Sequence, residues 1–272
     1  MKKKVIALAL SALMVTGLVG CGSDNNSSTS EGSTLKVGMV TDTGTIDDKS
    51  FNQGTWEGIE KAEKEFGLET TFMQPNGESE SSYLTEIQNL YDSGYKFIVT
   101  PGYKFETAIY KAQSQYEDAK FVLIDGEPND GNDNYVVADN TVAIYFAEEQ
   151  SGFIAGVAAA VELQTGDFGF IGGMEVPSVK KFNYGFQQGV AYANEHYGTN
   201  ISLKAENIVY SGSFSDTALG QQLAAQMYDS GVKAIFTAAA GVNIGVITEA
   251  KSRVVNGEEA WVIGVDSDQY DD

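Results

Sequence analysis

Two ten-residue stretches of this sequence are nearly the same: Tyr91-Asp-Ser-Gly-Tyr-Lys-Phe-Ile-Val-Thr100 and Tyr228-Asp-Ser-Gly-Val-Lys-Ala-Ile-Phe-Thr237. Seven of the ten positions carry the same residue. Each copy predicts a helix that ends at Asp-Ser-Gly, because glycine readily adopts the left-handed backbone that closes helices, and then a short buried strand. The echo predicts two lobes of the same α/β design, while convergence on common helix-ending residues is the alternative explanation.

The sequence around these stretches alternates between β-rich runs and amphipathic helical runs. Helical spacing is clear from Trp56 to Phe66 and from Tyr83 to Tyr91, and a glycine follows each run. Such alternation predicts parallel sheets covered by helices. We expect one lobe over residues 35–140 and a second over 141–272. The predicted strands are 35–41, 69–73, 97–100, 121–125, 135–139, 168–171, 208–210, 234–237 and 261–265.

The composition excludes several classes of protein. The 272 residues include 38 Asp and Glu against 17 Lys and Arg, a net charge of −21. A nucleic-acid binder needs basic side chains to meet phosphates, so no nucleic-acid partner is expected. Arg253 is the only arginine, which leaves no second guanidinium for a clamp on phosphate or carboxylate. The single cysteine excludes an internal disulfide and a cysteine-based metal site.

The first 34 residues have the pattern of an export signal and a tether. Three lysines precede an apolar run, which is typical of a signal peptide over residues 1–20. The sequence Leu18-Val19-Gly20-Cys21 resembles a bacterial lipobox, which implies a lipidated Cys21. Residues 21–34 then form a polar, flexible linker. We therefore expect a lipid-anchored protein on the extracytoplasmic face of the cell membrane.

Carboxylates follow three of the predicted strands. Asp42, Asp125 and Asp266 lie where strands end, and ligands of parallel α/β sheets bind beyond the carboxyl ends of strands. Ionised carboxylates accept hydrogen bonds, so a neutral ligand rich in N–H and O–H donors is favoured. Taken singly, each aspartate equally fits a helix cap. Phe51, in the polar loop after the first strand, either stacks on a planar ligand or packs beneath the loop.

Three motifs resemble those of the basic membrane protein family, which are lipoprotein substrate-binding components of ABC importers and include purine nucleoside receptors. The first is Asp42-Thr-Gly-x-Ile-Asp-Asp-Lys-Ser-Phe-Asn-Gln-x-x-Trp56-Glu-Gly. The others are Gly172-Gly-Met-Glu-Val-Pro-x-Val-x-x-Phe182-x-x-Gly-Phe and Val262-Ile-Gly-Val-Asp-Ser-Asp-Gln269. The resemblance runs from the lipobox to the last residue.

The resemblance implies a type I periplasmic-binding-protein fold, in which two doubly wound parallel-sheet lobes are joined by a hinge. It implies that Asp42 and Asp125 bind the base of a nucleoside, with Asn52 nearby. Phe51 from one lobe and Phe182 from the other would sandwich that base.

The resemblance also implies that Asp266 takes the ribose hydroxyls, beside the backbone of Gly241. The expected partners are a nucleoside and ABC permease subunits. The protein is expected to be a monomer with no enzymatic activity, no catalytic residue, no cofactor and no metal. Family members continue past the last motif, whereas this chain stops at Asp272, so we expect the hinge return of the C-terminal lobe to be missing.

Three other functions are alternatives. A sugar receptor of the same fold would also use carboxylates and aromatic rings. A nucleoside hydrolase would carry an acidic calcium loop after its first strand, but Val40 replaces the first aspartate of that pattern and Gly44 lies one residue too far from Asp47. A role as an adhesin or surface antigen stays open as a secondary function.

Overall fold

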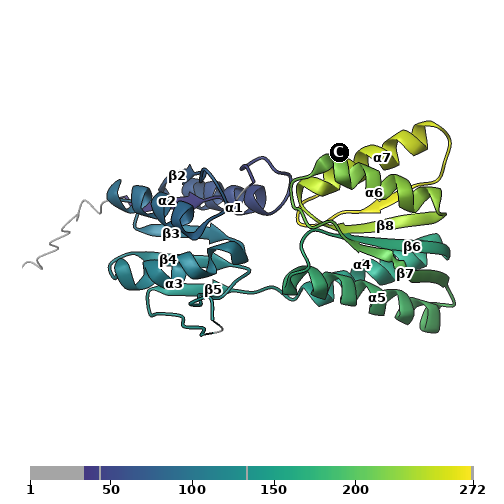
Figure 1. Cartoon of the computed structure of the whole chain (residues 1–272), viewed down its shortest axis with the longest axis horizontal. Helices are drawn as coiled ribbons and strands as arrows, with labels where there is room; N and C mark the ends of the chain where they lie inside the picture. Colours follow the sequence, from purple (N-terminus) through teal and green to yellow (C-terminus); the bar gives the residue numbers. More distant parts are fainter. Residues whose placement is uncertain (1–33, 43, 133, 271–272) are drawn as a thin grey trace, which may run out of the picture. The chain divides into compact units, whose positions relative to one another are not determined.

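Five parallel strands form the first sheet of the computed structural model, which describes residues 34–42, 44–132 and 134–270. The strand order is β2-β1-β3-β4-β5 (Figure 1). The predicted signal peptide, Cys21 and the linker up to residue 33 lie outside the described residues. The elements are β1 (Lys36–Val40), α1 (Phe51–Phe66), β2 (Glu69–Met73), α2 (Glu80–Asp92), β3 (Phe97–Pro101), the short 3-10 helix η1 (Tyr103–Phe105), α3 (Glu106–Gln115), β4 (Lys120–Ile124) and β5 (Thr141–Ile144).

Four parallel strands form the second sheet, in the order β7-β6-β8-β9. These four strands repeat the order of the first four strands of the first sheet, since β6 corresponds to β1, β7 to β2, β8 to β3 and β9 to β4. The elements are α4 (Glu148–Leu163), β6 (Thr165–Gly172), α5 (Pro177–Tyr197), β7 (Asn200–Tyr210), α6 (Thr217–Asp229), β8 (Val232–Ala238), α7 (Gly241–Val255) and β9 (Trp261–Ile263).

The repeated sequence occupies equivalent places in the two sheets. In the first sheet it contains the end of α2 and the start of β3, and in the second the end of α6 and the start of β8. The predicted α/β fold with two parallel sheets is therefore confirmed. The predicted helix ending at Gly67 also has its expected geometry, because Gly67 has φ 66° and donates its N–H to the Glu63 carbonyl at 2.8 Å.

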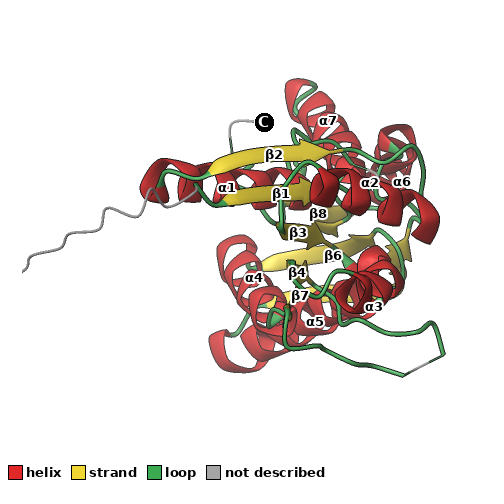
Figure 2. Cartoon of the chain, turned by 90° about the vertical axis from the view of Figure 1, so that its left-hand side faces the viewer, coloured by secondary structure: helices red, strands yellow, loops and turns green. Residues whose placement is uncertain are grey.

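Helices cover both faces of each sheet, and Figure 2 shows red helices on either side of the yellow strands. In the first sheet, α2 and α3 bury one face around Ile98, Phe121 and Leu123, while Ile59 of α1 packs on the other face. In the second sheet, α4 and α5 pack on one face and α6 and α7 on the other. Because successive side chains of a strand point to opposite faces of the sheet, the apolar runs of these strands supply a core on both sides.

The predicted strand at 135–139 is wrong. Only an isolated bridge joins Tyr135 to Asn129. Backbone groups of Val136 and Ala138 form hydrogen bonds with the side chain of Gln113 and not with a neighbouring strand. Gln113 donates to the Val136 carbonyl at 2.9 Å and accepts from the Ala138 N–H at 3.1 Å. The strand that follows β4 is β5, and its pairing with β4 carries the first sheet up to Ile144, past the expected lobe boundary at 140.

Facing glycines allow α4 and α5 to pack at close range. A Cβ added to Gly152 or Gly156 of α4, or to Gly185 or Gly189 of α5, would lie 2.1–2.4 Å from a backbone carbonyl oxygen of the other helix. No side-chain motion can relieve such a contact, because the opposing atom belongs to a helix backbone. The absence of four side chains therefore fixes the distance between these helices.

We expect Gly189→Ala to destabilise the protein by about 1–3 kcal/mol, because the new methyl group would overlap the Phe153 carbonyl oxygen. Gly58→Ala is the matched control, since a Cβ there meets nothing within 4 Å on the exposed side of α1. The control should gain about 0.5–1 kcal/mol from helix propensity. Urea unfolding measures both. Equal stability of the two variants would contradict the close packing of α4 and α5.

Candidate functional site

The site begins with the strand order. In both sheets the order reverses beside the first strand, between β1 and β3 and between β6 and β8, and ligands of such sheets bind at that reversal. A cavity of 1340 Å³ lies at these strand ends and takes lining residues from both sheets. All seven predicted site residues line it: Asp42, Phe51, Asn52, Asp125, Phe182, Gly241 and Asp266.

The cavity is larger than the roughly 300–1,000 Å³ of a typical small-molecule site. Part of it extends under α1, where its lining is apolar and includes Leu35, Val37, Ile59 and Phe97. The polar part at the strand ends is therefore the candidate binding site, and its volume is a fraction of the whole.

Asp48 organises the loop between β1 and α1. Its carboxylate accepts from the backbone N–H groups of Ser50 at 2.9 Å, Gln53 at 3.1 Å and Asn52 at 3.3 Å. These are the unpaired N–H groups at the start of α1, and a negative charge there is favourable. Because Asp48 caps the helix, the hydroxyl of Ser50, which occupies the N-cap position, is free for another contact.

Asn52 holds two carboxylates together. Its side chain is buried and donates to Asp42 Oδ1 at 2.7 Å and to Asp48 Oδ2 at 2.8 Å. It also accepts from the backbone N–H of Asp42 at 3.1 Å. With these three bonds made inside the protein, Asn52 is placed to orient Asp42 and not to meet a ligand directly.

Asp125 sits at the end of β4 in a constrained backbone. Its φ is 59°, a left-handed value that few residues other than glycine adopt, and its N–H donates to the Ile144 carbonyl at 2.7 Å. The carboxyl group interacts with Glu148 and with the hydroxyl of Ser178. Burial, together with the hydrogen bond to Glu148, raises the pKa of Asp125 to about 6.

Asp266 comes from the loop after β9 and reaches the loop before α1. Ser50 Oγ donates to Asp266 Oδ2 at 2.5 Å. Desolvation of the carboxyl group by neighbouring protein atoms raises the pKa of Asp266. The residue as a whole is nevertheless accessible to solvent. Ser267 Oγ and Gln269 Nε2 bond to the Lys49 carbonyl at 2.8 and 3.2 Å. A short polar contact therefore joins the loops that follow β1 and β9.

Residues with positive φ, the left-handed backbone region, are concentrated at this site. Of the five described non-glycine residues with positive φ, three line the cavity: Asp125, Ala240 with φ 47°, and Asp266 with φ 70°. A fourth, Lys49 with φ 55°, lies between two lining residues. Such conformations persist where the surrounding structure holds them, and they concentrate at functional sites.

Two aromatic rings and one glycine complete the predicted set. Phe51 is the first residue of α1 and is half-buried. Phe182 of α5 packs edge-on against Phe236, with ring centroids 6.1 Å apart and planes at 79°. Gly241, the first residue of α7, donates its N–H to the Phe214 carbonyl at 2.9 Å and accepts at its own carbonyl from Thr217 Oγ1 at 3.1 Å. These bonds leave less of the Gly241 backbone for a ligand than the family resemblance implied.

The charged side chains that line the cavity all carry negative charge. Six acidic side chains line it, and the same set of lining residues contains no lysine or arginine. Nor do the described residues include a group of three or more His, Cys, Asp or Glu side chains placed to hold a metal ion. The arrangement suits a ligand that offers hydrogen-bond donors and carries no negative charge.

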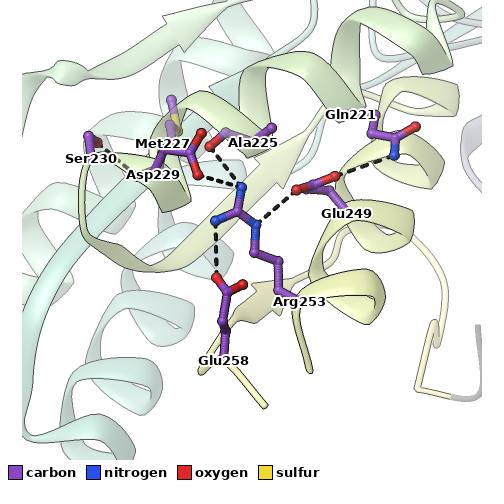
Figure 3. A network of polar contacts seen from close by, with 8 residues as sticks. All are labelled: Gln221, Ala225, Met227, Asp229, Ser230, Glu249, Arg253 and Glu258. Carbon is purple, nitrogen blue, oxygen red and sulfur yellow. Dashed lines mark hydrogen bonds and ion pairs between the residues drawn. The ribbon is translucent and has the colours of Figure 1, made fainter. Parts of the chain in front are cut away.

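Arg253 is used elsewhere for structure (Figure 3). Its guanidinium pairs with Asp229 at 2.7 Å, Glu249 at 2.9 Å and Glu258 at 3.1 Å, and it joins α6, α7 and the segment after α7. These hydrogen bonds raise the pKa of Arg253 further above its ordinary value. The only arginine of the chain is thus committed to the second lobe, outside the lining of the cavity.

Several polar residues of the cavity are absent from the predicted set, among them Ser50, Glu148 and Ser178. Ser50 lies inside the first family motif, next to Phe51. Glu148 is one of two adjacent glutamates in the first turn of α4, and nothing in the sequence distinguishes the buried one from its exposed neighbour. Ser178 lies inside the second family motif, at a position that the motif leaves unspecified.

A pair of doubly wound parallel sheets with a polar cavity at their strand ends defines the class of two-lobed solute-binding proteins. The chain belongs to the Bmp family, described as "ABC transporter substrate-binding protein PnrA-like", which matches residues 35–272. The predicted family is confirmed, and it is a family of transporter components, not of enzymes. No helix in the described part of the chain is long and apolar enough to cross a membrane.

Curated relatives and a solved structure agree with this assignment. The ABC transporter nucleoside-binding protein BmpA of Lactococcus lactis subsp. cremoris is 37% identical over 279 residues, 99% of this chain and 75% of the relative. The CD4+ T-cell-stimulating antigen of Listeria innocua is 35% identical over 285 residues, 100% and 75% of the two chains. An ABC transporter solute-binding protein from Aeropyrum pernix K1 superposes with a TM-score of 0.75 at 26% identity, covering 86% of this chain and 63% of that one.

We expect Asn52→Ala to cost about 1–3 kcal/mol of stability, because Asp42 and Asp48 lose their shared donor in a buried place. Asn89→Ala removes a single bond to Glu86 on the exposed face of α2 and should change stability by less than about 0.5 kcal/mol. Chemical denaturation of both variants checks this difference. Equal effects would show that Asn52 does not organise the loop.

Proposed function

We propose that this protein is a lipid-anchored extracytoplasmic receptor that captures purine nucleosides for import by an ABC transporter. The main support is the lining of the cavity: six carboxylates and several aromatic rings, Phe51 and Phe182 among them, with no basic side chain among the described lining residues. A nucleoside is neutral, carries N–H and O–H donors, and has a flat ring. Nucleotides and free carboxylates would be repelled. The name of the Lactococcus lactis relative, a nucleoside-binding protein, supports the same ligand class.

The proposed contacts divide the ligand between the two lobes. Asp42 and Asp125 accept from the base, and Asn52 holds Asp42 in place for that bond. Phe51 and Phe182 lie on opposite faces of the base, one ring from α1 and the other from α5. Asp266 accepts from the ribose hydroxyls through the oxygen that Ser50 does not occupy.

Capture by such a site works through closure of the lobes. Each contact to the ligand that uses both lobes stabilises the closed state relative to the open one. The permease then recognises the loaded receptor. Cys21 lies outside the described residues, so the tether rests on the lipobox alone.

A ligand panel tests the function directly. A ligand that binds only the folded protein raises its melting temperature, and the shift grows with the logarithm of ligand concentration above the Kd. We expect inosine, guanosine or adenosine to raise the melting temperature, with no shift for ribose, arabinose or nucleoside monophosphates. A shift with arabinose or ribose alone would favour a sugar receptor. If the monophosphates bind as well as the nucleosides, the charge argument is wrong.

Asp266→Ala should weaken nucleoside binding by about 10–100-fold, because a hydrogen bond to an ionised group is lost, while the fold is retained. Asp268→Ala is the matched control, because Asp268 is an exposed aspartate two residues away that accepts a hydrogen bond from the Tyr270 N–H. Isothermal titration with inosine compares the two variants. Unchanged affinity in Asp266→Ala would contradict the proposed ribose contact.

A further inference from the structure

Two carboxyl groups from different parts of the fold meet at one side of the cavity. Asp125 follows β4, and Glu148 is the first residue of α4. Both line the cavity, and they lie within hydrogen-bonding reach of each other. Two ionised carboxylates at such a distance repel, whereas a carboxylate and a carboxylic acid attract through a shared proton.

Glu148 is buried in an unusual way. Its side chain is 3% exposed, and Lys181 Nζ lies 3.1 Å from Glu148 Oε2. Its other oxygen, Oε1, receives no hydrogen bond from the described protein. A buried oxygen without a donor is costly, and a proton held between Glu148 and Asp125 would satisfy it.

The other charged and titratable groups around the pair are few. From α5 come Lys181 and the hydroxyl of Ser178, which donates to Asp125. Tyr145 lies after β5, with Lys181 Nζ 5.9 Å from its ring centroid, and its pKa is raised to about 12, so it stays neutral. Tyr103 of η1 also has a raised pKa. Glu149 of α4 is exposed.

Glu106 of α3 and Glu127, which follows β4, are further acids near this end of the strand, and both act on Tyr145 together with Asp125. The Glu106 carboxylate accepts from the Glu127 N–H at 3.1 Å and from Asn129 Nδ2 at 2.7 Å, so it already has hydrogen-bond partners. One lysine therefore faces two carboxyl groups within the described structure. Burial and Glu148 raise the pKa of Asp125 to about 6, and Lys181 opposes that rise.

Purine nucleosides differ at the atom that a carboxyl group would meet. The 6-oxopurines inosine and guanosine carry a hydrogen on N1 and need an acceptor. The 6-aminopurine adenosine has a lone pair on N1 and needs a donor. An ionised carboxylate is only an acceptor, while a protonated carboxyl group also donates.

We propose that Asp125 and Glu148 act as one proton-sharing unit, which binds 6-oxopurine nucleosides when it is ionised and 6-aminopurine nucleosides when it holds the proton. Glu148 is then a specificity-determining residue that acts through Asp125. This inference rests on the proposed nucleoside function and adds to it a dependence of base preference on pH.

The test is isothermal titration of the full chain with inosine and with adenosine at pH 5.0 and 7.5. From the higher to the lower pH, we expect inosine affinity to fall and adenosine affinity to rise, each by about tenfold, since burial and Glu148 raise the pKa of Asp125 to about 6 and its carboxyl group takes up a proton between these pH values. The N1 atoms of both free nucleosides keep their protonation state across this range. Both nucleosides binding with a constant affinity ratio would overturn the inference and leave the receptor function standing.

Glu148→Gln separates the shared proton from a simple structural role. The amide keeps the size of the side chain but removes one acid, so the pKa of Asp125 should fall and inosine affinity should change less than about threefold between the two pH values. Glu149→Gln, at the exposed neighbour, should keep the wild-type pH profile. A wild-type profile in Glu148→Gln would overturn the role of Glu148. Failure of every nucleoside to bind at both pH values would overturn the receptor function and this inference together.

Discussion

Negative charge at the ends of parallel strands is the constraint on which the rest of this structure depends. Asp42, Asp48, Asp125, Glu148 and Asp266 all meet around one cavity. No basic side chain lines that cavity in the described chain, although Lys181 pairs with Glu148 from outside the lining. Neutral donors hold Asp42, Asp48 and Asp266. Asp48 takes the N–H groups that begin α1, Asn52 bridges Asp42 and Asp48, and Ser50 bonds to Asp266. The remaining acceptor capacity is what a neutral ligand with several donors would use.

Holding these groups requires a rigid frame. The glycines of α4 and α5 bring the two helices into backbone contact, and Glu148 and Ser178 lie in the first turns of those helices. Arg253 ties α6 to α7 at a distance from the cavity lining. On this frame, Asp125, Ala240 and Asp266 keep left-handed backbone that would be unfavourable in an unsupported loop. Regular helices and strands thus stabilise the irregular positions at the site.

Much of the fold could be predicted from the sequence because hydrophobic periodicity and helix-ending glycines are local signals. The repeated Asp-Ser-Gly stretches marked equivalent places in both sheets, and the strand at 69–73 was predicted with its observed bounds. The prediction of a strand at 135–139 was wrong because the segment has the composition of a strand, whereas two of its backbone groups form hydrogen bonds with the side chain of Gln113, which is distant in the sequence. Such a bond cannot be read from local pattern.

The site was predictable to the extent that it lies in the family motifs. Five of the seven predicted residues lie inside the three motifs, whereas Asp125 and Gly241 lie outside them. All seven line one cavity, and their contacts to a ligand stay a prediction. The burial of Glu148 could not be predicted, because its neighbour Glu149 has the same chemistry and only the packing of α4 against α5 decides which of the two turns inward. Nor could the sequence show that Asn52 donates to both Asp42 and Asp48, because that depends on how close the two carboxylates lie in the folded chain.

A crystal structure of the chain with inosine bound would test the proposed nucleoside site. We expect the base between Phe51 and Phe182, its N1 within hydrogen-bonding distance of the Asp125 carboxyl group, and the ribose hydroxyls on Asp266. Inosine bound outside the cavity, or bound with its ribose between the two rings, would be incompatible with that site.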